Sequence, residues 1–237
     1  MLQHTNNYTF ITAKMKMADV LACYNNLIIL LPRIGISLGF GEKSVKQVCE
    51  DNGVSLPLFL LICNAYTQDD YMPEREELQN CDINDFLQYL KASHNDYIDN
   101  EFTHIEHHLH DVMQDWNEKY RTTILKFFEE YKKEVVCHFQ HEEDVIFPYI
   151  QDLKEKRKPR RKKFSVADFD RQHDNIEDKL RDFTNLLIKY IPADVAQRER
   201  IFMLIDIFSL SDDIEKHAIL EEKILIPYIK TLENNEI

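Results

Sequence analysis

A pattern of thirteen residues occurs twice in the sequence, and it combines residue types that bind metal ions. It reads HFQHEEDVIFPYI at residues 138–150 and HAILEEKILIPYI at residues 217–229. In each copy a histidine stands four residues before a glutamate, so an α-helix would place the imidazole and the carboxylate on one face, one turn apart. The two pairs that result are His138 with Glu142, and His217 with Glu221.

Both pairs fall on the apolar stripe of their helices. At 100° per residue, Val135 lies on the face of His138, and Ile214 lies on the face of His217. A single pair of this kind would be interpreted as a surface contact, since such pairs are common by chance in helical chains rich in glutamate. Two pairs that face a core are different, because a buried charge is costly unless it is paired or bound to a metal ion. The repeat therefore predicts a metal centre.

A metal centre in a helical protein needs ligands from the remaining helices as well. In the stretch FSVADFDRQHDNIEDKL, His173 shares its stripe with Phe169 and Ile176 and is the only histidine. The stretch SHNDYIDNEFTHIEHHLHD offers five histidines. We choose His94 among them, because Ile98 and other apolar residues share its face.

The other four histidines of that stretch are His104, His107, His108 and His110. Three of them turn away from the apolar stripe. His108 is closer to it, but it stands 14 residues beyond His94, about 21 Å along the helix axis, and cannot share the same ion. We interpret the group as a solvated, histidine-rich face rather than a second metal site, although stretches of this kind sometimes bind metal.

The expected ligands are four histidines and two glutamates: His94, His138, Glu142, His173, His217 and Glu221. A carboxylate has two oxygens and can bridge two ions, whereas an imidazole binds one ion through a given nitrogen. Two ions would then share the glutamates and take two histidines each, with positions left open for oxygen, nitric oxide, an oxo bridge or water. Imidazole and carboxylate together suit iron, manganese or zinc. The neighbouring Glu143 and Glu222 fit equally well as hydrogen-bond acceptors for the ligands or as solvated residues.

Ligands spread along the chain in this way require a helical bundle to bring them together. From Ile83 onward, apolar residues recur with a helical period over four long stretches, at about 83–115, 119–150, 165–190 and 195–230. The sequence therefore predicts an all-α protein with an up-down four-helix bundle over residues 83–237.

The first part of the chain differs from the bundle. Residues 1–70 predict a small helical domain, with one helix that ends at Gly53 and another that begins at Ser55. Residues 71–82 are polar, contain Pro73 and predict a linker.

Composition excludes several functions. The 237 residues carry a formal net charge of −13, which argues against a nucleic-acid binder, and the basic run KEKRKPRRKK at 154–163 is expected to be a solvated loop. No stretch approaches the roughly 20 apolar residues of a membrane span, and the N-terminus lacks the apolar core of a secretory signal. We therefore expect a cytoplasmic protein without membrane contact. The 5 cysteines are scattered and form no CxxC, which argues against a disulfide framework or a cysteine zinc site.

The ligand-bearing segments together have a family likeness. His94 in HNDYI, the segment HFQHEEDVIFP, His173 in RQHDNIE and the segment HAILEEKILIP resemble the hemerythrin-like HHE domain. More narrowly, they resemble the iron-sulfur cluster repair di-iron proteins, a family linked to nitrosative and oxidative stress. The resemblance implies a centre of two iron ions, bridged by oxo and carboxylate groups and held by the same six residues. It also implies small diatomic ligands, O2 or NO, and iron-sulfur proteins as partners, and it leaves an oligomer open.

The chain departs from the repair family in its N-terminal domain. That family has a Gly-Ile-Asp-aromatic-Cys-Cys-Gly-Gly turn, whereas this chain reads GISLGFGEK, with Gly39 and Phe40 in the places of the paired cysteines. Chemistry that needs adjacent cysteines would be lost here. Two functions remain open: a stress protein that binds or reduces NO or oxygen species or donates iron for cluster repair, and a sensor or regulatory module that uses the same centre. A structural zinc site is a third alternative.

Overall fold

The computed structural model describes residues 10–114, 116–157, 166–190 and 197–234. Within these ranges the regular elements are helices, apart from an isolated bridge between Lys16 and Ser44, so the predicted all-α class is confirmed. The chain divides into two compact units. One holds residues up to Ser93 together with those from Ile219 onward, and the other holds the residues between them.

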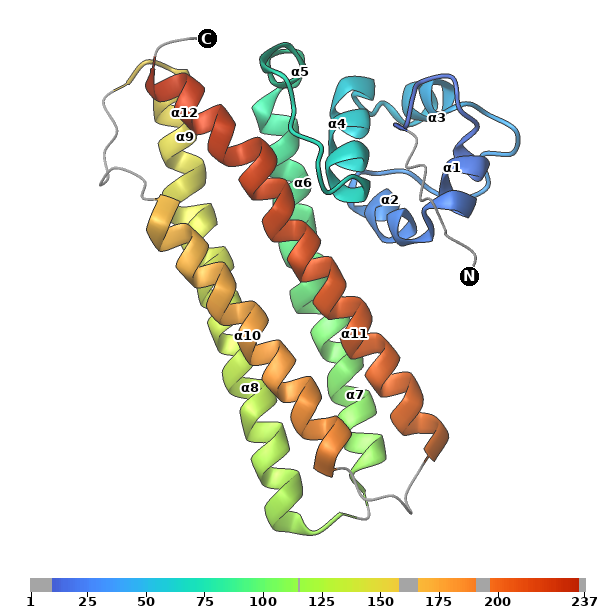
Figure 1. Ribbon diagram of the computed structural model, residues 1–237, viewed down its shortest axis with the longest axis vertical. Helices are drawn as coiled ribbons and strands as arrows, with labels where there is room; N and C mark the ends of the chain where they lie inside the picture. Colours follow the sequence, from blue (N-terminus) through green and yellow to red (C-terminus); the bar gives the residue numbers. More distant parts are fainter. Residues whose placement is uncertain (1–9, 115, 158–165, 191–196, 235–237) are drawn as a thin grey trace, which may run out of the picture. The chain divides into compact units, whose positions relative to one another are not determined.

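The unit that begins at His94 contains the four long helical rods of the predicted up-down bundle, which alternate in direction (Figure 1). In the described residues, three of the long helical rods include a π-helical turn, labelled η2, η3 and η4, whereas η1 in the N-terminal part of the chain is a 3-10 helix. Within this unit, the first rod consists of the end of α6 (Ile83–Asp96), η2 (Tyr97–Glu101) and α7 (Phe102–Val112). The second rod consists of α8 (Glu118–His141), η3 (Glu142–Ile146) and α9 (Phe147–Lys154). The third rod is α10 (Val166–Tyr190), and the fourth begins with α11 (Gln197–Leu220).

One apolar core holds the four rods together. Each rod contributes fully buried side chains to it, among them Leu109 of α7, Phe128 of α8, Phe183 of α10 and Ile207 of α11. The rings of Phe128 and Phe183 stack with their centroids 5.4 Å apart. Apolar residues spaced three and four apart along each helix form this core, which is the physical basis of the periodicity seen in the sequence.

Two of the π-turns, η3 and η4, lie in the two copies of the sequence repeat and share a pattern. Backbone N–H groups bond five residues back, from Phe147 to Glu142 in η3 and from Ile226 to Glu221 in η4 (Glu221–Leu225). Pro148 and Pro227 stand two residues beyond these turns. A proline has no N–H, and its ring clashes with the carbonyl four residues before it in a regular helix. The wider π-turn gives that ring room, so each helix continues past the proline of its repeat.

The other unit combines the N-terminal helices with the end of the chain. Its elements are α1 (Met17–Cys23), η1 (Asn25–Ile29), α2 (Leu30–Arg33), α3 (Val45–Asn52), α4 (Leu56–Thr67), α5 (Arg75–Gln79), most of α6, η4 and α12 (Ile226–Glu233). As predicted, α3 ends at Gly53, whose φ of 66° is left-handed, and α4 begins at Ser55, whose hydroxyl accepts from the N–H of Leu58. The segment expected as a linker contains α5. The domain boundaries proposed from the sequence stay predictions.

A buried lysine joins the two ends of the chain within this unit. Lys223 of η4 donates from Nζ to the carbonyl oxygens of Gln68 and Asp69, at 2.8 and 2.7 Å. These carbonyls lie just beyond α4, where the helix dipole places partial negative charge. The last rod is thereby tied to the N-terminal helices two residues after Glu221.

Two sequence expectations concern surface and membrane. Residues 158–163 of the basic run lie outside the described residues, so its expected role as a solvated loop stays a prediction. Among the described helices, none has the length and apolar character needed to cross a bilayer.

Candidate metal centre

The structure brings the six predicted ligands together in the interior. All six residues are less than a tenth exposed, and the two glutamates are fully buried. They form two overlapping groups, in each of which one ligand atom of every residue lies within 4.8 Å of the others. Both groups contain Glu142 and Glu221, and the histidine pairs are His94 with His217 and His138 with His173.

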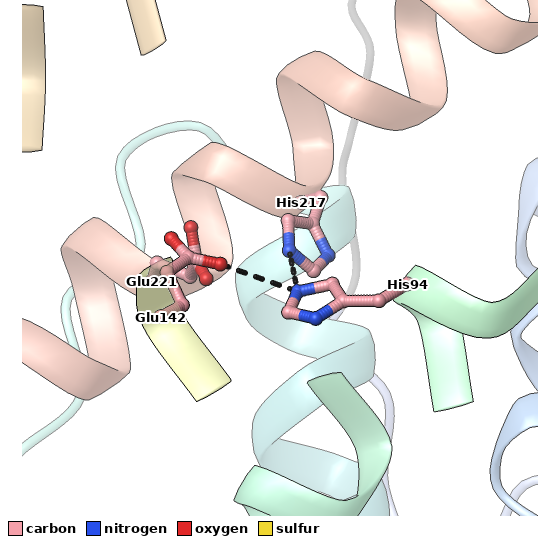
Figure 2. Close-up of side chains that lie close together, drawn as sticks. All are labelled: His94, Glu142, His217 and Glu221. Carbon is pink, nitrogen blue, oxygen red and sulfur yellow. Dashed lines mark hydrogen bonds and ion pairs between the residues drawn. The ribbon is translucent and has the colours of Figure 1, made fainter. Parts of the chain in front are cut away.

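The first group contains the pair from α6 and α11 (Figure 2). The Nε2 atoms of His94 and His217 are 3.2 Å apart. His94 Nε2 also lies 3.3 Å from Oε2 of Glu142. In Figure 2 the carboxylate of Glu221, one turn beyond His217, lies beside that of Glu142.

The second group contains the pair from α8 and α10, and it meets the other oxygen of the same glutamate. The Nε2 atoms of His138 and His173 are 3.0 Å apart. Oε1 of Glu142 lies 3.2 Å from His138 Nε2 and 3.8 Å from His173 Nε2. Glu142 therefore stands between the two histidine pairs, with one oxygen toward each.

Hydrogen bonds at the far side of two rings fix which nitrogen faces the centre. His94 Nδ1 donates to Oε1 of Glu143 at 3.0 Å, and His138 Nδ1 donates to Oε1 of Gln172 at 3.2 Å. With the proton held on Nδ1, the lone pair of Nε2 is directed inward, as a metal ligand requires. Glu143 thus takes the first of the two roles left open by the sequence, whereas Glu222 is exposed. Gln172 was not expected, and its position beside His173 is the only sequence signal for it.

Aromatic side chains restrain the histidine rings. Phe139 lies flat on His94, with ring centroids 4.1 Å apart and an angle of 7° between the planes. Tyr97 presents its edge to His217 at 5.7 Å and anchors its own hydroxyl by donating to the carbonyl of Asp213. These ring contacts restrict the orientation of the two imidazoles.

A small cavity opens beside three of the histidines. Its volume is about 10 Å³, close to the least that holds one water molecule. Its walls are mostly apolar, formed by Val135, His138, Phe139, His173, Ile176, Glu177, Ile214, His217 and Ala218. A cavity of this size has room for about one water-sized molecule.

The donor set fits a metal ion better than it fits hydrogen bonding alone. The Nε2 atoms of the two histidine pairs lie only 3.0 and 3.2 Å apart. Two fully buried carboxylates lie beside them, and burial of carboxylates is costly unless a cation or hydrogen bonds compensate for it. Because a metal–imidazole bond is about 2.0–2.1 Å long, two Nε2 atoms at this spacing could both bind one ion.

Comparison with known proteins also indicates that the helical rods form a cation-binding domain. A family model described as the hemerythrin HHE cation binding domain matches residues 85–229. No curated protein and no solved structure matches the chain significantly. The matched segment covers more than half of the chain and includes all six residues of the candidate centre. The chain therefore belongs to the hemerythrin HHE cation-binding domain family.

Proposed function

We propose that this chain is a non-haem di-iron protein whose centre binds a diatomic molecule, O2 or NO, in the response to nitrosative or oxidative stress. The position of Glu142 carries the proposal. Its Oε1 faces His138 and its Oε2 faces His94, so the carboxylate would bridge two ions that take two histidines each. Glu221 belongs to both ligand groups and is the second bridge. When bound, the irons would supply electrons and open coordination positions to the diatomic molecule.

The residues around the ions would contribute orientation and exclusion of water. Glu143 and Gln172 hold the protons of His94 and His138 on Nδ1, which keeps their Nε2 atoms available as ligands. The cavity of about 10 Å³ beside the histidines favours a small, weakly polar molecule. Its apolar walls would keep bulk water and larger reductants away from the ions.

Among the roles open to such a centre, binding or reduction of O2 or NO fits the chain better than cysteine-dependent repair. Gly39 and Phe40 occupy the places of the paired cysteines. In the unit that contains the N-terminal helices, burial raises the pKa of the Cys49 thiol and of the Cys81 thiol to about 11 each. These thiols stay protonated at neutral pH and are poor nucleophiles. Donation of iron to iron-sulfur proteins would have to proceed from the centre itself.

One observation favours a sensor as the second candidate function. Lys223 stands two residues after Glu221 and donates to the carbonyls of Gln68 and Asp69. A change of ligation at Glu221 would shift η4, and this hydrogen-bonded lysine would pass the shift to the end of α4. The N-terminal helices would then present the state of the centre to a partner protein.

The first experiment measures metal content by mass spectrometry, together with the visible spectrum before and after addition of NO, on protein purified without oxygen. We expect about two irons per chain and a spectrum that NO changes. Glu142→Ala should lose both properties, because it removes the bridge between the histidine pairs. Glu222→Ala is the matched control, since this exposed residue follows Glu221 directly and should leave iron and spectrum unchanged. Zinc in place of iron, or a full iron content in Glu142→Ala, would contradict the proposal.

A further inference from the structure

A group of histidine and aspartate side chains outside the buried centre has residue types that can bind a metal ion. Across the described residues, the possible ligand groups are the two of the buried centre and a third, formed by His104, His108 and Asp206. The two histidines are one turn apart on α7, and the aspartate comes from α11. One ligand atom of each lies within 4.8 Å of the others.

The three side chains converge without a hydrogen bond to explain it. Asp206 Oδ2 lies 3.4 Å from His104 Nε2 and 3.1 Å from His108 Nδ1. This oxygen is buried, and none of the described residues donates a hydrogen bond to it in suitable geometry. A buried oxygen that accepts no hydrogen bond is costly. The rings of the two histidines lie beside each other, with centroids 4.4 Å apart and an angle of 48° between their planes.

The histidine-rich stretch of α7 is therefore not uniform. From the sequence it was interpreted as one solvated face, and His107 and His110 are indeed exposed. His104 and His108, by contrast, meet an acidic partner from another helix. The sequence interpretation missed this partner because Asp206 is about a hundred residues further along the chain.

We propose that His104, His108 and Asp206 bind one divalent transition-metal cation, with Zn²⁺ as the ion that fits best. Two imidazoles and one carboxylate are the ligand set of open zinc sites, whereas Mg²⁺ and Ca²⁺ prefer oxygen ligands throughout. The side chain of His104 is 56% exposed and those of the other two are 28% exposed, so water can complete the coordination. The ion would cross-link α7 to α11.

This site is separate from the buried centre. His104 stands ten residues beyond His94, about 15 Å along the rod, and Asp206 stands eleven residues before His217, about 16 Å. No ion can be shared across these distances. The outer ion would instead cross-link α7 and α11 in the part of the bundle that lies away from the buried ligands. The rods of these two helices carry His94 and His217.

The test is a titration of the full chain, with its buried centre already loaded with metal, by Zn²⁺ in a calorimeter. We expect one additional Zn²⁺ per chain, with the metal of the buried centre retained by mass spectrometry. His104→Ala and Asp206→Asn should each weaken this binding at least tenfold. A Co²⁺ titration followed by visible absorption gives a second readout, because ligand-field bands would appear in the unmodified chain and not in His104→Ala.

His110→Ala is the matched control, because it removes an exposed histidine from the same helix without touching the three ligands. It should bind Zn²⁺ as the unmodified chain does. The proposal is overturned if the unmodified chain binds no additional Zn²⁺, or if His110→Ala weakens binding as much as His104→Ala, which would indicate adventitious binding by surface histidines. Folding of each variant is checked by circular dichroism, and since His104 is more than half exposed, its loss leaves the core unchanged.

Discussion

The two neighbouring glutamates of the first repeat have different chemical positions. Glu142 is fully buried and directs its two oxygens at two histidine pairs, whereas Glu143, the next residue along the helix, accepts a hydrogen bond from Nδ1 of His94. The helix separates them by about 100°, so adjacent acidic residues serve one inner and one outer position of the same site. Glu142 would bind the ions, and Glu143 would orient the ligand His94.

This division of roles gives a prediction for Glu143→Ala. The change removes the acceptor at His94 Nδ1, so that ring can exchange tautomers and rotate, and iron affinity should fall about 10- to 100-fold. The measurement is competition with a chelator of known affinity. Glu222→Ala, at the equivalent place of the second repeat, should change affinity little because its side chain is exposed. Equal losses in the two variants would show that a general charge effect, and not orientation of His94, controls affinity.

At the residue scale, the sequence was sufficient to propose the six ligands but not their surroundings. His94 could be selected from five histidines because the helical period of the apolar residues, which a single sequence shows, indicates which histidine faces the core. The bond from His138 to Gln172 joins α8 to α10, and the stacking of Phe139 on His94 joins α8 to α6. Such contacts depend on the spacing and rotation of neighbouring helices, which periodicity does not determine.

At the scale of elements, the π-turns are the feature that sequence periodicity misses. Two of them begin at the proposed bridging residues, Glu142 and Glu221. Each turn inserts one residue into the helical repeat, so the chain beyond it is rotated while the rod stays continuous. The prolines of the repeats were a visible signal, but a proline in a helical pattern more often indicates a kink or an end. The predicted bundle was therefore confirmed, whereas its local geometry at the ligands was not foreseen.

Lys223 provides a prediction about how elements are joined. Lys223→Met keeps the length of the side chain but removes the donor to the carbonyls of Gln68 and Asp69. Hydrogen bonds from a charged donor contribute about 1.5–3 kcal/mol, so the free energy of unfolding should fall by about 2 kcal/mol. Urea unfolding followed by circular dichroism measures this. Lys230→Met, an exposed change further along the same rod, is the control and should alter stability by less than about 0.5 kcal/mol.

At the scale of the whole molecule, the candidate centre is also a set of cross-links. Its ligands come from every rod of the bundle, so bound ions would hold α6, α8, α10 and α11 to one another. Without ions, the same interior contains two fully buried carboxylates close to each other. The arrangement should therefore favour metal strongly and leave the metal-free chain less stable than its apolar core alone would allow.

Metal removal and Glu142→Gln separate the stabilisation by bound ions from the destabilisation by buried carboxylates. A free metal concentration of 1,000 times the dissociation constant stabilises a protein by about 4 kcal/mol per site, so chelation should lower the melting temperature of the unmodified chain by about 10 °C or more. Glu142→Gln keeps the shape of the side chain and removes a buried negative charge. The metal-free variant should therefore melt higher than the metal-free unmodified chain, yet gain little when metal is added. Scanning calorimetry with and without chelator measures all four states. If the variant without metal melted lower than the unmodified chain without metal, Glu142 would be stabilising the fold through its histidine contacts, and its burial would need no ion.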